Sequence, residues 1–478
     1  MDDPMAKSGQ QKKAKSTAAA GIALDRVNHR RAAHGPVYRQ LYDTIKEAIL
    51  AGTFPDGARL PSSRSLAVQL GLSRTTVDLA YNLLAGDGLV QGRTAKGTRV
   101  TSGVKAPVAP QRKALALGAS MSPARSLPLA PGAAAVDLFP RALWSRLATR
   151  HAKSLLPDDL VARDPAGHPR LREAIANRVR LVRGMACDAG QVFVTAGVAG
   201  AVLLVANACG AQCKKTLAHR ETLSLPLRHA FEALGISIEA PDFSALEGNR
   251  WPAAALAVVN AEDLEMRARP RHAAVTRSLV QWARSHSAWM LEEDRDLDLF
   301  HEGLHPALLA GSAAPEVSIY LGSFERSVFP AVGCAFVVVP HALVEQFAAA
   351  SEQSPWTAPL QTQRVLSDFI TQGYIGRHAN RLRRTHQERR QFAIGMLRKG
   401  RATGRLHFEA VGSCLVASLQ PLGPTTDLRT DLRLSGLGAK VLCAPDLPCE
   451  LLQLGYAGVP AKELGAAIEQ LDALLARL

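Results

Sequence analysis

The stretch Leu60 to Val100, LPSSRSLAVQLGLSRTTVDLAYNLLAGDGLVQGRTAKGTRV, contains two short helical patterns of apolar residues on either side of Gly71. The first pattern consists of Leu66, Val68 and Leu70, and the second of Val77, Ala80, Tyr81, Leu83 and Leu84. Two short helices joined by a tight turn are typical of a helix-turn-helix. The spacing therefore predicts this motif, with its second helix beginning after Ser73.

The first turn of the second helix carries side chains suited to DNA. Ser73 is placed to cap the helix, and Arg74, Thr75 and Thr76 follow it. In such motifs the N-terminal residues of the second helix meet base edges in the major groove. Arginine can bond guanine through two donors, and threonine offers a hydroxyl to phosphate and a methyl to thymine. These four residues are therefore predicted to bind DNA.

The residues after this helix, LVQGRTAKGTRV, predict two short strands around a glycine-containing tip. Such a wing would carry Arg93, Lys96 and Arg99. Upstream, apolar residues at helical spacing predict an amphipathic helix from Val37 to about Gly52. The alternative is a small helical bundle whose arginines and threonines are merely solvated, but that interpretation does not explain the wing.

The segment Pro36 to Val100 resembles the winged helix-turn-helix of the GntR superfamily of bacterial transcription regulators, above all in LPSSRSLA, LGLSRTTV and the wing. The resemblance implies that Arg64, at the start of the first helix of the pair, is a further DNA contact. It also implies that the partner is double-stranded operator DNA.

The composition agrees with a polyanionic partner, because 57 Lys and Arg stand against 42 Asp and Glu, a net charge of +15. Residues 1–33 are polar and basic, which predicts a disordered arm without a signal peptide, and hence a cytoplasmic protein. Seven scattered cysteines without CxxC pairs predict reduced thiols and no metal site. The apolar run Ala189 to Cys213 is interrupted by glycines and polar residues, which favours a strand, a turn and a helix over a membrane span.

The length of 478 residues predicts two or three domains. After the basic arm, residues 34–102 form the predicted DNA-binding domain. Residues 103–135 are rich in Ala and Pro, which predicts a linker. In residues 136–478, β-type runs such as QVFVTAG and LAVVN alternate with helical ones. This alternation predicts an α/β domain with a mainly parallel sheet, followed by a small C-terminal α+β subdomain.

Four segments of the α/β domain resemble fold-type I aminotransferases, which use pyridoxal phosphate (PLP): DPAGHPRLREAIANRVRLVRG, VTAGVAGAVLLV, WMLEEDRDLDLF and YLGSFERSVFP. In that family the second segment holds the cofactor phosphate through backbone amides, the third supplies the carboxylate beneath the pyridine nitrogen, and the fourth supplies the Schiff-base lysine. A GntR-type winged helix joined to such a domain is the arrangement of the MocR subfamily of regulators. The resemblance implies a homodimer, since these domains form two-fold dimers.

The site positions depart from the aminotransferase pattern. The lysine position falls on Arg326, whose guanidinium stays protonated and cannot form an imine. No lysine occurs between Lys215 and Lys399, so a shift in register cannot restore one. The other departures are Glu293 at the pyridine carboxylate, Arg295 at a tyrosine position, and Gly333 where an arginine helps to hold the phosphate. Together they predict no catalytic residue, no PLP cofactor and no enzyme activity.

Arg326 has two interpretations. In the first it is structural and pairs with an acidic neighbour, which is Glu292, Glu293, Asp294 or Asp296. In the second, Arg326 and Arg295 bind a small anionic effector, helped by the amides of the turn that holds Gly197 and Gly200. Further residues expected in the same cleft are His301 and Glu325.

These observations favour a sequence-specific DNA-binding regulator whose inactive aminotransferase-like domain serves dimerisation and effector sensing. A PLP-dependent enzyme, or a regulator that binds PLP without a covalent bond, is one alternative. A non-specific nucleic-acid-binding protein is another. The missing lysine counts against the enzyme, and the well-formed recognition helix counts against non-specific binding.

Overall fold

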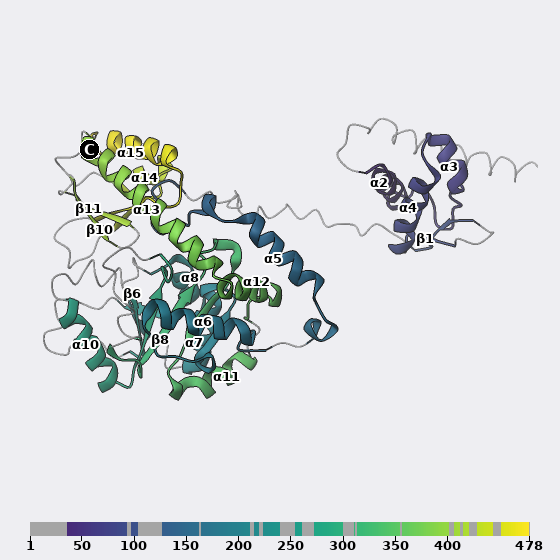
Figure 1. Ribbon diagram of the computed structural model, residues 1–478. Coiled ribbons are helices and arrows are strands. Elements are labelled where there is room, and N and C mark those ends of the chain that lie inside the picture. The colour runs from purple at the N-terminus through teal and green to yellow at the C-terminus, as the bar shows by residue number, and fades with distance from the viewer. Residues whose placement is uncertain are drawn as a thin grey trace, which may run out of the picture. The chain divides into compact units, whose positions relative to one another are not determined.

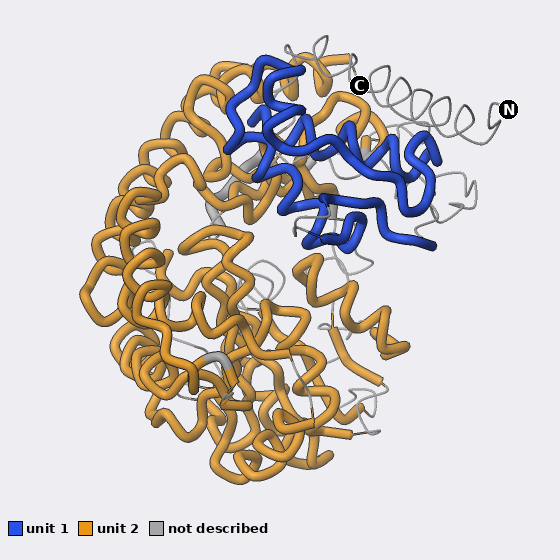
Figure 2. Tube along the Cα trace, turned by 90° about the vertical axis from the view of Figure 1, so that its right-hand side faces the viewer, with its two compact units in different colours: residues 1–122 blue, residues 123–478 orange. Residues whose placement is uncertain are grey.

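The computed structural model divides into two compact units, residues 1–122 and residues 123–478 (Figures 1 and 2). The residues that it describes are 36–92, 97–103, 127–161, 164–210, 215–218, 223–239, 254–260, 272–299, 310, 313–353, 356–400, 406–411, 414–419, 428–442 and 451–477. The predicted N-terminal arm, Arg93, Lys96 and His301 lie outside them.

The first unit is the predicted winged helix-turn-helix. Its elements are α2 (Val37–Leu50), α3 (Ser63–Leu70), α4 (Arg74–Gly86), β1 (Val90–Gln91) and β2 (Arg99–Val100). The apolar faces of the three helices meet in one core, in which Leu41, Leu66 and Leu84 are fully buried. The strands β1 and β2 pair antiparallel, with Val90 opposite Val100.

Two residues of α3 and its C-terminal turn show how the local sequence shapes this unit. Gly71 ends α3 in the left-handed conformation at a φ of 63°, which a residue without Cβ adopts at little cost. Val68, which the apolar pattern included, is 80% exposed. It lies two positions from both Leu66 and Leu70 and therefore points to the opposite side of the helix.

The second unit is built on a seven-stranded sheet in the order β3-β9-β8-β7-β6-β4-β5. Its strands are β3 (Val192–Thr195), β4 (Lys215–Leu217), β5 (Ser237–Glu239), β6 (Leu256–Asn260), β7 (Trp289–Asp294), β8 (Ser318–Ser323) and β9 (Ala335–Val338). The strands from β5 across to β8 pair in parallel, as predicted, whereas β9 runs antiparallel to both of its neighbours.

Helices cover both faces of this sheet. They are α5 (Arg141–Lys153), α6 (Pro169–Arg183), α7 (Gly197–Cys209), α8 (Leu225–Ala233), α10 (His272–Ser285), α11 (Val344–Gln353) and α12 (Leu360–Thr371). Val192 and Val194 of β3 pack with α6 and α12, while Phe193 between them packs with α7 and α11 on the other face. Helices therefore pack on both faces of the sheet. The carboxyl ends of β7 and β8 lie near the amino ends of α7 and α8.

A smaller C-terminal subdomain follows the long helix α13 (Tyr374–Lys399), as Figure 1 shows. It contains a four-stranded antiparallel sheet and two helices: β10 (Leu406–Val411), β11 (Cys414–Leu419), α14 (Leu428–Leu434), β12 (Lys440–Leu442), β13 (Leu451–Gly455) and α15 (Ala461–Leu475). The predicted α+β subdomain is therefore present. The apolar run from Ala189 forms a 3-10 turn, β3 and α7, and no helix in the described residues is long and apolar enough to cross a membrane.

The last part of the predicted linker packs onto the second unit. We call residues 127–135 the strap. The backbone N–H groups of Gly438 and Gly455 donate to the carbonyls of Pro128 and Leu129, at 2.8 and 2.9 Å. Leu129 is only 3% exposed and belongs to the core of the C-terminal subdomain. The structured second unit therefore begins before residue 136. The Ala- and Pro-rich composition of the strap is typical of a linker and does not predict that it docks.

Candidate functional site

The N-terminal turn of α4 presents the residues predicted to bind DNA. The hydroxyl of Ser73 accepts the Thr76 N–H at 3.1 Å and lies 2.7 Å from the Thr76 hydroxyl. Ser73 is therefore the N-cap that the sequence predicts, and it fixes where the helix begins. Arg74 and Thr75, which follow the cap, are exposed.

The Arg74 side chain is 70% exposed and its Nε atom lies 3.6 Å from a carboxylate oxygen of Asp78. An exposed ion pair of this kind contributes at most about 1 kcal/mol, so it leaves the guanidinium free to reach a base edge. Arg64 is also exposed, in the first turn of α3. The first turns of α3 and α4 therefore both present an arginine to solvent.

The base of the wing adds a cation that the sequence analysis did not single out. Arg59 forms an isolated bridge with Arg99, and its guanidinium lies against Gly97, where an added Cβ would come within 2.8 Å of its Nε atom. The Arg99 guanidinium donates to the carbonyl of Gly57 at 3.0 Å. Arg59 precedes the helix-turn-helix in sequence, so only its backbone pairing with the wing reveals this position.

The second unit has a cavity of about 240 Å³ at the carboxyl edge of its parallel strands. Its walls are the strap, the amino ends of α7 and α8, and the residues at the ends of β7 and β8: Pro131, Gly132, Val198, Ser224, Leu225, Pro226, Glu293, Arg295, Ser323, Glu325 and Arg326. We call it the sheet-edge cavity. Open α/β sheets bind their ligands at this edge.

Arg326 forms an ion pair inside this cavity. Its Nη1 atom lies 2.9 Å from a carboxylate oxygen of Asp296, and the two side chains are 12% and 14% exposed. The guanidinium also lies under the strap, because a Cβ added to Gly132 would be 3.3 Å from its Cζ atom. Asp296 is therefore the acidic partner of Arg326 that the first interpretation expects. The Arg326 guanidinium lies between Asp296 and Gly132 of the strap.

The other three acids considered as partners of Arg326 are held elsewhere. Asp294 bonds Arg183 and the hydroxyl of Tyr320, and Glu292 accepts the Ala310 N–H at 3.0 Å. One carboxylate oxygen of Glu293 accepts the Ser224 N–H at 3.5 Å and lies 4.0 Å from Nε of Arg295. The other oxygen of Glu293, Oε1, has no hydrogen-bond partner among the described residues, although the residue is only 2% exposed.

Glu325 faces the amino end of α7. A Cβ on Gly197 would lie 2.9 Å from a carboxylate oxygen of Glu325, which also accepts the backbone N–H of Val198. Burial raises the pKa of Glu325, the Val198 hydrogen bond lowers it, and the charge of Glu293 raises it further, with a net upward direction. The positive end of the helix is therefore already occupied by a carboxylate of the chain itself.

The remaining predicted positions lie apart from the cavity. Gly200 faces Trp356, whose carbonyl oxygen would be 3.2 Å from an added Cβ, so only Gly197 of the two turn glycines faces Glu325. Gly333 ends a 3-10 turn at a φ of 53° with open space around it. In the part of the chain that the structure describes, no group of three or more His, Cys, Asp or Glu is arranged to hold a metal ion.

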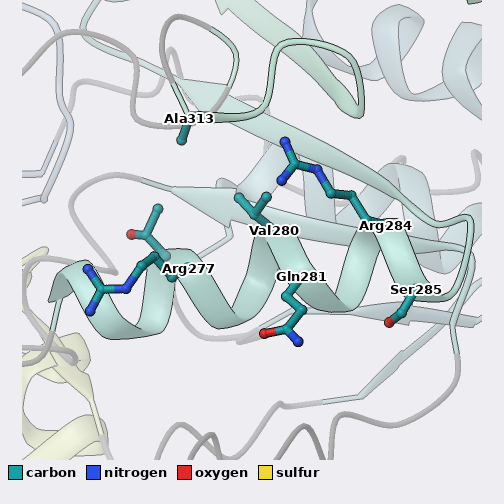
Figure 3. Close-up of a pocket in the computed structure, with 7 residues that line it drawn as sticks. Arg277, Val280, Gln281, Arg284, Ser285 and Ala313 are labelled. Carbon is teal, nitrogen blue, oxygen red and sulfur yellow. The ribbon is translucent and has the colours of Figure 1, made fainter.

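A larger hollow of about 750 Å³ is lined by residues of α10 and by Ala313 (Figure 3). It is lined by Arg277, Val280, Gln281 and Arg284, among others, and Arg284 pairs with Glu316 at 2.5 Å. None of the residues predicted from the sequence lines this hollow.

The residues of the sheet-edge cavity do not fit PLP. An imine requires an amine, whereas the position that the resemblance assigns to the lysine holds the guanidinium of Arg326, which is paired with Asp296. A bound phosphate requires free amides at the amino end of α7, where the Glu325 carboxylate already accepts the Val198 N–H. The Arg326 guanidinium and the Val198 N–H are therefore both engaged by carboxylates of the protein itself.

Comparison with known proteins agrees with this architecture. Residues 37–100 match the family described as "Bacterial regulatory proteins, gntR family". The second unit has the fold of solved aminotransferases, such as the α-aminoadipate aminotransferase LysN of Thermus thermophilus (TM-score 0.61, 20% identity, 73% of this chain and 92% of that chain). A Thermus thermophilus aspartate aminotransferase mutant gives a TM-score of 0.58 at 19% identity over 73% of this chain and 96% of that one.

The chain therefore combines a GntR-type helix-turn-helix with a fold-type I aminotransferase-like α/β unit. It is similar to the probable rhizopine catabolism regulatory protein MocR of Rhizobium meliloti, with 29% identity over 76% of this chain and 78% of that protein. It is also similar to the pyridoxine biosynthesis transcriptional regulator PdxR of Corynebacterium glutamicum, with 29% identity over 73% of this chain and 76% of that protein. Both of these relatives are named as regulatory proteins, and each match extends over more than two thirds of both chains.

Proposed function

We propose that the protein is a sequence-specific DNA-binding transcription regulator of the cytoplasm that binds operator DNA as a homodimer. The observation that carries the proposal is the first turn of α4, where a Ser73 cap holds an exposed Arg74 at the position that enters the major groove. The net charge of +15 supports association with DNA but carries no sequence information.

The aminotransferase-like unit serves dimerisation and effector sensing in this proposal, without catalysis. The inactivity rests on the arginine at the lysine position and on its ion pair with Asp296. A two-fold dimer would present two winged helices, so the operator should contain paired half-sites.

The test is genome-wide footprinting of the bound wild-type protein, followed by competition with random DNA. We expect discrete sites that share a paired motif, and we expect random DNA to compete poorly. Diffuse occupancy without a shared motif, or equal competition by random DNA, contradicts sequence-specific regulation and leaves only charge-driven binding.

The Arg326→Lys variant is expected not to form an imine with PLP. The new amine would stand at the right position, but Glu325 would still hold the Val198 N–H and compete with a phosphate. The measurement is the visible absorbance spectrum of the variant mixed with PLP. The wild-type protein is the control for imines at other lysines, and an additional imine band in the variant would show that the cavity still accepts the cofactor.

A further inference from the structure

The sheet-edge cavity contains two carboxylates that are not fully neutralised by the arginines around them. Arg326 is directed to Asp296, at 2.9 Å, and Arg295 approaches only one oxygen of Glu293, at 4.0 Å. Glu325 faces the same cavity and lies close enough to Glu293 for the two charges to repel each other. A cation placed between these carboxylates would relieve this repulsion.

Oε1 of Glu293 is the second observation that points to a ligand. It lies in a residue that lines the cavity and is only 2% exposed, yet no described residue donates a hydrogen bond to it. A buried carboxylate oxygen without a partner is destabilising, because the oxygen has lost its hydration. A ligand that brings an N–H donor would restore the missing bond.

The same cavity is poorly suited to an external anion. The amino end of α7 is occupied by Glu325, and the Ser224 N–H at the start of α8 faces Glu293. The two arginines that would be expected to bind an anion face Asp296 and Glu293. An incoming carboxylate or phosphate would therefore have to displace a carboxylate of the chain at each of these positions.

We propose that the sheet-edge cavity binds a small ligand that carries a primary ammonium group, which donates to Oε1 of Glu293 and lies within reach of Glu325. The cavity volume of about 240 Å³ limits the ligand to a compact molecule, since pockets for drug-sized ligands begin near about 300 Å³. The role of this ligand as an effector rests on the function proposed above, whereas its binding does not.

The test is isothermal titration calorimetry of the full chain with propylamine, propionate and inorganic phosphate as probes. We expect propylamine to bind the wild-type protein, and we expect neither anion to bind. The Glu293→Gln variant keeps the side-chain shape but loses the charge, and it should bind propylamine at least about tenfold more weakly. The matched control is Glu316→Gln, an exposed carboxylate paired with Arg284 outside the cavity, which should leave propylamine affinity unchanged.

A second variant, Glu325→Gln, keeps the inference testable if Glu293→Gln does not fold, and it should also weaken propylamine binding several-fold. Absence of propylamine binding, unchanged binding in both variants, or preferential binding of phosphate to the wild-type protein would overturn the inference. Operator binding is measured on the same preparations. Operator binding without amine binding overturns only this site, whereas equal binding of operator and random DNA overturns the proposed regulator.

Discussion

Arg74→Ala is expected to weaken operator binding by about tenfold to a hundredfold, because a bidentate contact with guanine contributes about 1–3 kcal/mol of discrimination. Arg74 follows the Ser73 cap, its side chain is 70% exposed, and its partner Asp78 is 3.6 Å away. The substitution removes no buried contact, so the first unit should remain folded. The measurement is fluorescence anisotropy with operator DNA from footprinting, at one fixed salt concentration.

The matched control for Arg74→Ala is Arg284→Ala. Arg284 is likewise an exposed arginine paired with one carboxylate, that of Glu316, but it lies on α10 in the second unit. Both variants lose one positive charge, so an effect of net charge alone would lower the two affinities alike, whereas loss of a phosphate contact of Arg74 would weaken binding to operator and random DNA equally. Equal losses would mean that Arg74 contributes charge and no base recognition. A loss confined to Arg74→Ala, and larger for operator than for random DNA, is the expected pattern.

Gly455→Ala is expected to lower the free energy of unfolding of the second unit by about 2–4 kcal/mol, as overpacking against backbone does when neighbours cannot move freely. A Cβ at this position would lie 1.9 Å from the carbonyl oxygen of Ala130 and 2.5 Å from its carbonyl carbon. The strap would have to move, and the Leu129 side chain would lose its place in the core.

Urea unfolding followed by tryptophan fluorescence measures this change, because all five tryptophans fall between residues 144 and 356, in the second unit. The control is Gly395→Ala on α13, where nothing lies within 4 Å of an added Cβ. Alanine should stabilise that helix by about 0.5–1 kcal/mol. If the two variants unfolded at the same urea concentration, the strap would contribute nothing to the stability of the second unit.

The helix-turn-helix could be predicted almost completely from the sequence, because each of its determinants is local. The Ser73 cap, the Gly71 turn and the apolar spacing act within a few residues of one another. The parallel strands also follow from the alternation of β-type and helical runs. The antiparallel direction of β9 does not, because it depends on how a short connection after β8 reverses the chain.

The cavity could be predicted only in part. The position of Arg326 and the set of acids near it follow from the sequence, but the choice of Asp296 depends on side-chain directions at the end of β7. The contact of Glu325 with Val198 joins segments more than a hundred residues apart, and no local sequence pattern predicts it. The docking of the strap depends on two distant glycines, Gly438 and Gly455, whose N–H groups donate to its carbonyls and whose lack of a Cβ allows the close approach.

The strap is the first part of the second unit that the structure describes after the DNA-binding unit. Gly132 lies over Arg326 in the wall of the cavity, and the same short segment is where the linker joins the second unit. A molecule that fills the cavity shares a wall with this segment. If residues 127–135 were released from the second unit, these nine residues could span on the order of 30 Å as extended chain. Under the proposed function, in which the protein binds DNA as a dimer, docking and release of the strap would therefore change the half-site spacings that the dimer could span.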